Sequence, residues 1–162
     1  MFVRVKWVKK RPYGYLVKNI WTKKGPRQKV VKYIGPVHEI KEVVEDKTKE
    51  VFSERVQDII TGLIVRELTA REFVEGKRGW YNKGEYRVHP KAGHVLHNGK
   101  PIAIRMNEGF MCRPNLKELR KLVEGGAVTG IELANGILEA GIHIEKESFV
   151  QLFERITSQT QN

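Results

Sequence analysis

The side chains best placed to do chemistry are the cations within the first 35 residues. That segment holds 11 Lys or Arg and no Asp or Glu, whereas the other 127 residues hold 19 Lys or Arg and 19 Asp or Glu. The net charge of +11 therefore originates at one end of the chain. A segregated positive field is typical of proteins that bind a polyanion, because Lys and Arg neutralise phosphates and release their counterions. We predict a nucleic-acid-binding surface that contains Arg4, Lys6, Lys9, Lys10, Arg11, Lys18, Lys23, Lys24, Arg27, Lys29 and Lys32.

Aromatic residues accompany these cations. The same 35 residues contain six of them, and aromatic faces can stack on unpaired bases or hold a cation above the ring. We expect Tyr13 and Trp21 to be exposed and to take part in binding. We expect Trp7, Tyr15 and Tyr33 to belong to the hydrophobic core, where aromatic side chains are most often found.

The cations are also grouped along the sequence. Lys9, Lys10 and Arg11 form one cluster, and a second consists of Lys23, Lys24 and Arg27, so that two basic clamps are expected at two turns. A further basic stripe is formed by Arg113, Lys117, Arg120 and Lys121, whose spacing of i, i+4, i+7 and i+8 places them on one face of a helix. This stripe could extend the phosphate-binding track.

Three histidines offer an enzymatic alternative. His89, His94 and His97 occur within nine residues, so that a metal site of a nuclease is conceivable. The spacing is weak support, because His94 and His97 would point to opposite faces of a strand and no paired cysteines accompany them. The single Cys112 is expected to be a small core residue, and no Gly-rich phosphate loop is present, so we expect no cofactor.

Three strands are expected to carry the cationic segment. Residues 2–9 alternate between apolar and basic side chains, and residues 13–22 and 28–34 are rich in aromatic and β-branched residues. We predict a three-stranded antiparallel meander over residues 1–36. Its turns should lie where glycine and proline occur, with Pro12 and Gly14 at the first, Gly25 and Pro26 at the second, and Gly35 and Pro36 at the end of the unit.

This segment resembles a short β segment near the start of some insertion-sequence transposases of the DDE type. There a Y-x-Y-L-V strand is followed by a basic G-x-x-R-Q-x-V turn and strand that ends in Y-L-G. The matching residues here are Tyr13, Tyr15, Leu16, Val17, Gly25, Arg27, Gln28, Val30, Tyr33 and Gly35, with Ile34 in place of the usual Leu. The resemblance covers about a fifth of the chain and implies a DNA-handling β module. It does not imply transposition, because the three metal-binding acids of the family have no counterparts here.

The middle of the chain predicts helices and then strands. Apolar residues between 49 and 75 repeat at helical spacing, and the T-x-x-E box of Thr69 and Glu72 predicts a second helix after a break near Arg66. We expect these helices of the 37–78 region to pack on the N-terminal sheet. Within residues 79–112, Asn98-Gly99 is a type I′ turn signal and predicts a β-hairpin.

The last third of the chain is helical in pattern. Over residues 113–157 we predict three helices, the first beginning near Pro114 and the second capped by Thr129 and Glu132. In the second helix Ile131, Ala134, Ile137 and Leu138 are expected to face inward. Residues 158–162 are expected to be a frayed tail.

The sequence thus predicts an α+β protein with a basic N-terminal β-meander, helices, a β-hairpin and a C-terminal helical segment. The function it favours is non-catalytic nucleic-acid binding, with DNA preferred to RNA because of the transposase-like segment. A structural or assembly protein that self-associates through its C-terminal helices is the first alternative, and a metal-dependent nuclease is the second. No apolar run approaches the roughly 18 residues that a membrane span requires, and no signal sequence is seen, so an intracellular, cytoplasmic protein is expected.

Overall fold

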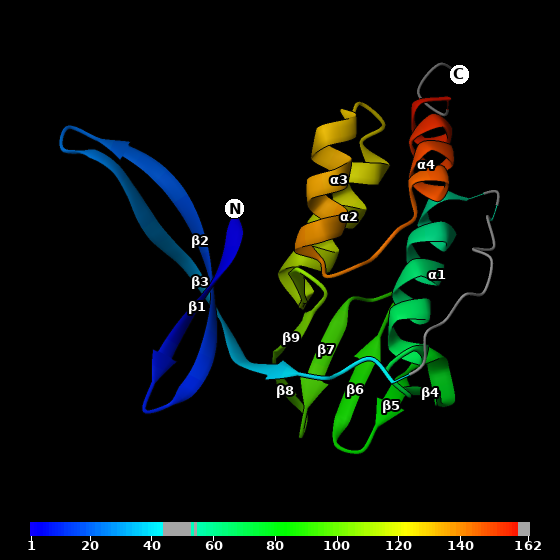
Figure 1. The fold of residues 1–162 in the computed structure, drawn as a ribbon, viewed down its shortest axis with the longest axis horizontal. Helices are drawn as coiled ribbons and strands as arrows, with labels where there is room; N and C mark the ends of the chain where they lie inside the picture. The colour runs from blue at the N-terminus through cyan, green and yellow to red at the C-terminus, as the bar shows by residue number, and fades with distance from the viewer. Residues whose placement is uncertain (44–52, 54, 159–162) are drawn as a thin grey trace.

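The computed structural model describes residues 1–43, 53 and 55–158 (Figure 1). Within those residues the chain forms four α-helices and two five-stranded sheets, which confirms the predicted α+β class. None of the helices in this part of the chain combines the length and the apolar composition needed to cross a membrane. The first part of the predicted 49–75 helical region and residues 159–162 of the predicted tail lie outside the described residues.

The first sheet joins the N-terminal strands to two strands from the middle of the chain. In spatial order its strands are β1 (Phe2–Val8), β2 (Arg11–Thr22), β3 (Gly25–Glu39), β9 (Ala103–Met106) and β10 (Gly109–Met111). Only the β3–β9 pair is parallel, and it spans Val37 to Glu39 on the β3 side. The three N-terminal strands, blue in Figure 1, project to one side of the rest of the molecule.

The turns of this sheet do not lie where glycine and proline predicted them. Lys9 and Lys10 form the first turn, while Pro12 and Gly14 lie inside β2. Val8 and Arg11 form the closing pair of the hairpin, so the nitrogen of the next residue, Pro12, points away from β1. It points to the β3 side, where the pairing between β2 and β3 ends at Tyr13. Its missing N–H therefore costs no ladder hydrogen bond.

The second turn and the end of the unit also differ from the prediction. Residues 23–24 form the turn between β2 and β3, so that Gly25 begins β3. The strand then continues through Gly35 and Pro36 to Glu39. Gly35 has φ 140°, and a Cβ added there would lie 2.2 Å from the backbone oxygen of Pro101. Glycine at position 35 thus allows the β3 backbone to lie close to the backbone of Pro101. The sequence predicts a strand end here.

The second sheet is built from consecutive short strands. They are β4 (Val74–Glu75), β5 (Tyr81–Lys83), β6 (Tyr86–His89), β7 (His94–His97) and β8 (Lys100–Pro101), and every neighbouring pair is antiparallel. The predicted type I′ turn is confirmed, because Asn98 has φ 49°, Gly99 has φ 71° and His97 pairs with Lys100.

The main hydrophobic core lies among the four helices, the second sheet and strands β9 and β10. The buried residues of α1 belong to this core, and the N-terminal strands instead form a smaller cluster with Ala103 and Cys112. The expectation that α1 packs on the N-terminal sheet is therefore not met. The helices are α1 (Val56–Thr69), α2 (Arg113–Glu124), α3 (Gly130–Glu139) and α4 (Lys146–Ser158).

Two helix predictions need correction. Helix α1 runs unbroken past Arg66 to Thr69, and Glu72 has φ 63°, so that Thr69 and Glu72 belong to a turn and not to the start of a second helix. In α3 the predicted capping box of Thr129 and Glu132 is present, but the inward face differs. The buried positions of α3 are Leu133 and Ile137, whereas Ile131, Ala134 and Leu138 are exposed.

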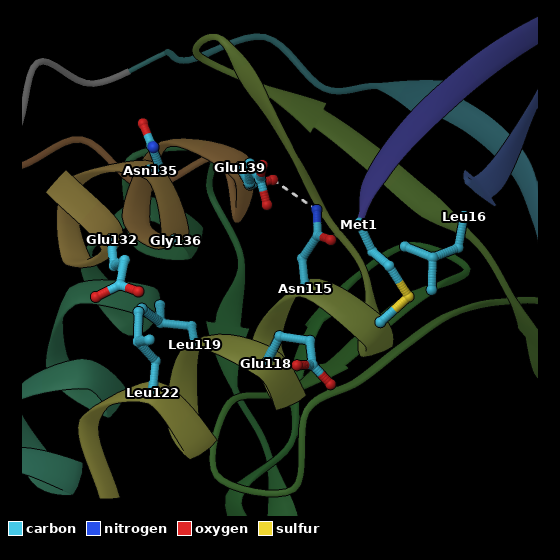
Figure 2. A pocket seen from close by; sticks show the side chains of 10 residues that line it. All are labelled: Met1, Leu16, Asn115, Glu118, Leu119, Leu122, Glu132, Asn135, Gly136 and Glu139. Carbon is cyan, nitrogen blue, oxygen red and sulfur yellow. Dashed lines mark hydrogen bonds between the residues drawn. The ribbon is translucent and has the colours of Figure 1, made fainter. Parts of the chain in front are cut away.

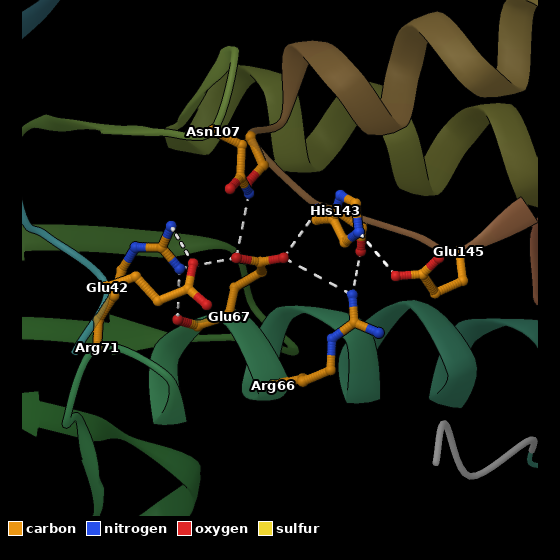
Figure 3. A network of polar contacts seen from close by, with 8 residues as sticks. Glu42, Arg66, Glu67, Arg71, Asn107, His143 and Glu145 are labelled. Atoms are coloured by element: carbon orange, nitrogen blue, oxygen red, sulfur yellow. Dashed lines mark hydrogen bonds and ion pairs between the residues drawn. The ribbon is translucent and has the colours of Figure 1, made fainter. Parts of the chain in front are cut away.

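A buried carboxylate, Glu67, ties α1 to two distant loops (Figure 3). Glu67 is 4% exposed, and its Oε2 accepts hydrogen bonds from Arg71 Nη1 at 2.7 Å and from Asn107 Nδ2 at 3.2 Å. Its Oε1 accepts the backbone N–H of His143 at 2.8 Å. Arg71 is buried as well and donates to the carbonyl oxygen of Ile40. This network therefore joins α1, the β9–β10 turn, the α3–α4 loop and the end of β3.

We expect Gly35→Ala to destabilise the protein by about 2 kcal/mol or more, because the methyl group meets backbone and the positive φ disfavours an L side chain. Urea unfolding measures the change. Gly62→Ala is the matched control, since an added Cβ there has no neighbour within 4 Å. Within helix α1 it should stabilise by ~0.5–1 kcal/mol. Equal effects of the two variants would contradict the close contact between β3 and Pro101.

Glu67→Ala should cost about 3–5 kcal/mol of unfolding free energy, because it leaves the Arg71 guanidinium buried without its closest carboxylate. Thermal and urea unfolding would both report the loss. In the control variant Glu118→Ala an exposed ion pair with Lys121 is removed, and the expected change is below ~1 kcal/mol. Similar stability of the two variants would show that the network is not needed.

Candidate nucleic-acid interface

The eleven cations of the first 35 residues all lie on the N-terminal strands or their turns, and all are exposed. Among the residues that the structure describes, none of these eleven is paired with a carboxylate. The guanidinium of Arg4 donates to Gln28 Oε1, which leaves its charge uncompensated. Up to Gly35 the three strands therefore carry exposed charges of a single sign.

Both predicted basic clamps lie at turns, at opposite ends of the projecting strands (Figure 1). Lys9 and Lys10 have φ of 47° and 63°, so that both central positions of the β1–β2 turn carry a lysine in the left-handed region. Turns of this shape favour Asn-Gly, because L side chains are strained there. The strained lysines are consistent with a functional requirement for charge at this turn.

One face of the N-terminal sheet is turned toward the body of the protein. On this inner face Leu16 and Ile34 are buried, and Val3 and Val5 pack against the cluster that contains Ala103 and Cys112. Cys112 is a buried core side chain, as predicted, and this burial raises the pKa of its thiol to about 12. The inner face thus anchors the sheet, and the opposite face is free to meet a partner.

That outer face carries a cluster of three tyrosines. The ring centroid of Tyr33 lies 6.3 Å from that of Tyr13 and 5.3 Å from that of Tyr15. Together with Val8 they line a shallow hollow of about 390 Å³, and Lys6 Nζ lies 5.1 Å from the Tyr15 ring centroid. Burial, and after it the neighbouring Tyr13 and Tyr15, raise the pKa of Tyr33 above its ordinary value.

The exposure of the aromatic residues corrects the sequence-based expectation. Trp7 is 69% exposed and Tyr33 is 50% exposed, and neither is a core residue. Trp21 is 85% exposed beside the β2–β3 turn, as predicted, whereas Tyr13, which was also predicted to be exposed, is half-buried like Tyr15. The aromatic surface is therefore larger than the sequence suggested, and its additional members are the residues predicted to be core.

The second basic stripe does not act as one surface. Arg113 and Lys117 are exposed, but Lys121 pairs with Glu118 at 3.3 Å. The guanidinium of Arg120 donates to Gln57 Oε1, Thr61 Oγ1 and the carbonyl oxygen of Pro90 at 2.7–3.0 Å. Burial lowers the pKa of Arg120, although Glu124 and Asp58 oppose that shift. Arg120 therefore holds α2 to α1 and is not available to a phosphate.

The three histidines are divided between two aromatic clusters. His89 and His94 face each other across β6 and β7 with Trp80 beside them, at centroid distances of 5.2 and 6.0 Å. His97 lies in the other cluster, 4.7 Å from the His38 ring and 4.5 Å from the Tyr86 ring. In the described part of the chain no group of three potential ligands is arranged to hold a metal. The three histidines thus do not share one site.

A pocket of about 320 Å³ lies between the chain start and helices α2 and α3 (Figure 2). Its lining combines Met1, Leu16 and Leu122 with three glutamates, Glu118, Glu132 and Glu139. Burial raises the pKa of Glu139, whereas hydrogen bonds from the backbone and side chain of Thr129 lower the pKa of Glu132. Acidic lining of this kind disfavours a phosphate, so the pocket is not part of the cationic surface.

Comparison with protein-family models, with curated proteins and with solved structures finds no match to this chain. The function is therefore argued from the chemistry of the surfaces described above.

We expect Arg120→Ala to lower the free energy of unfolding by about 2 kcal/mol, because three polar groups lose a charged donor. Lys117→Ala removes an exposed charge from the same helix and should change stability by less than ~0.5 kcal/mol. Denaturation curves of both variants test this. If Arg120→Ala left the free energy of unfolding unchanged, Arg120 would count as a free surface cation.

Proposed function

We propose that this protein is a non-catalytic DNA-binding protein whose contact surface is the basic, aromatic-containing N-terminal sheet. The observation that carries the proposal is the projecting sheet with eleven exposed cations and no ion-pairing carboxylate among the described residues. The like charges of such a surface repel one another. Binding to a polymer of phosphates is favourable, because it offsets this repulsion and releases the counterions of the polymer.

The shape of the sheet supports contact with duplex DNA. Beyond the last residues paired with β1, β2 and β3 continue as a two-stranded ribbon up to the turn at residues 23–24. The major groove of B-DNA admits a two-stranded ribbon of this kind. Lys18, Lys29 and Arg27 on the ribbon, with Lys23 and Lys24 at its end, would then meet the phosphates on either side of the groove.

Two arguments favour DNA over RNA. The first is the resemblance of residues 13–35 to the β segment of DDE-type transposases. The second is geometric, because the major groove of an A-form RNA helix is too narrow and deep for a ribbon to enter. We place the contact surface on the N-terminal cations, with Tyr13 and Trp21 beside them, and the exposed Arg113 and Lys117 as an outlying extension.

Self-association through the C-terminal helices is a second candidate function. Ile131 is 75% exposed and Leu138 is 45% exposed on the outer side of α3, so that this helix presents apolar residues to solvent. An assembly protein of this kind would form a stable oligomer and would bind duplex DNA poorly. Light scattering and duplex binding, measured together, separate the two candidates.

The DNA-binding proposal predicts a steep salt dependence. If about five phosphates are neutralised, log affinity for duplex DNA should fall with log salt at a slope of about −4 to −5. Changing Lys23, Lys24 and Arg27 together to Ala, at the end of the ribbon, should weaken binding and make the slope shallower by about 2 to 3. Filter-binding titrations over a series of salt concentrations measure both quantities.

The matched control removes the same number of exposed cations elsewhere. Lys77, Lys91 and Lys100 lie near the second sheet, and changing all three to Ala should leave the salt slope nearly unchanged. A flat salt response of the unmodified protein, or equal losses in both triple variants, would exclude the N-terminal sheet as the DNA-binding surface. Circular dichroism confirms that each variant is folded.

A further inference from the structure

We propose that the outer face of the N-terminal sheet, at Tyr13, Tyr15 and Tyr33, binds unpaired bases of a nucleic-acid single strand by stacking. This inference rests on the proposed DNA-binding function and deepens it, because it assigns a second kind of substrate to a distinct part of the same sheet. The ribbon end would take duplex phosphates, and the tyrosine face would take bases that are not paired.

The register of the strands gathers the three rings on one face. Arg4 of β1 pairs with Tyr15 of β2, and Tyr15 pairs with Tyr33 of β3, so that these side chains point the same way. Tyr13 lies two residues from Tyr15 on the same strand and therefore shares its face. The apolar residues that anchor the sheet, such as Leu16, lie on the opposite face. The tyrosines thus do not serve the anchoring contact.

The ring faces remain available to a ligand. The planes of Tyr13 and Tyr33 are inclined by 39°, and those of Tyr15 and Tyr33 by 54°, so that no ring in the cluster lies flat on another. Tyr33 is half-exposed, and the hollow that the three rings form with Val8 is open. A base stacks on an aromatic face whatever its sequence, because every base has a π-face.

Cations lie beside the tyrosines. Lys6 Nζ lies 5.1 Å from the Tyr15 ring centroid, Arg4 pairs with Tyr15 across β1 and β2, and the exposed Arg11 lies two residues before Tyr13. A base stacked on the cluster would therefore bring its phosphate next to a positive charge. Charge complementarity thus points to an anionic ligand with flat apolar groups, which is a single strand.

A duplex cannot use this face in the same way. Its bases are stacked on one another, and extruding one costs several kcal/mol. The tyrosine cluster is therefore expected to contribute to single-strand binding and to contribute little to duplex binding. This difference makes the inference separable from the proposed function itself.

The test compares two triple variants on oligothymidylate and on a duplex. Changing Tyr13, Tyr15 and Tyr33 to Leu removes the aromatic faces and should weaken oligothymidylate binding about tenfold or more, while duplex affinity changes less than about twofold. Changing the same three residues to Phe keeps the rings and should preserve binding. If the Leu triple variant fails to fold, Tyr33→Leu alone is used, because Tyr33 is half-exposed, with about a fivefold loss expected.

The outcomes separate the two proposals. Oligothymidylate binding unchanged by the Leu substitutions, or weakened equally by the Phe and Leu substitutions, overturns the stacking inference. An equal loss on duplex and single strand overturns it as well. The variant with Lys23, Lys24 and Arg27 changed to Ala reports on the DNA-binding function independently, because it retains all three tyrosines and the cations beside them. Oligouridylate serves as the RNA arm, where a ring-dependent affinity would extend the stacking to either polymer and its absence would assign it to DNA.

Discussion

Strand β3 is the element on which the arrangement of the molecule depends. It pairs with β2 along most of its length, and its last three residues pair in parallel with β9 in the body. At the junction Gly35 allows the backbone to approach that of Pro101. A sheet that carries eleven like charges repels itself, so that it must be fixed by contacts that do not involve those charges. The parallel pairing and the apolar cluster around Ala103 and Cys112 supply such contacts.

This anchoring explains why the two faces of the N-terminal sheet differ. The inner face is apolar near the body, while the outer face and both turns are left to solvent. Charge is thus displaced from the core, where an uncompensated cation would be costly, to strands that project away from it. In the rest of the protein, by contrast, the charged side chains of Glu67 and Arg71 are buried together and hydrogen-bonded to each other.

Local signals in the sequence predicted the elements whose cause is local. Asn98-Gly99 gave the type I′ turn because both residues tolerate positive φ, and Thr129 with Glu132 gave the capping box that begins α3. Signals that depend on tertiary contacts misled the prediction. Gly35 indicated a strand end but serves a close approach of two backbones, and Ile131 indicated a buried position but lies on the exposed side of α3.

The sequence by itself determined the charge of the candidate interface, because eleven cations without one acid within 35 residues cannot be neutralised locally. It also determined the mixed α and β content through its periodicities. Only the tertiary structure decided which side chains are free. Arg120 has the same helical spacing as its basic neighbours, yet its guanidinium is hydrogen-bonded to α1. Tyr33 is of a residue type common in cores, yet the rest of the protein covers the opposite face of its sheet. Burial depends on what packs against a face, and that partner is distant in sequence.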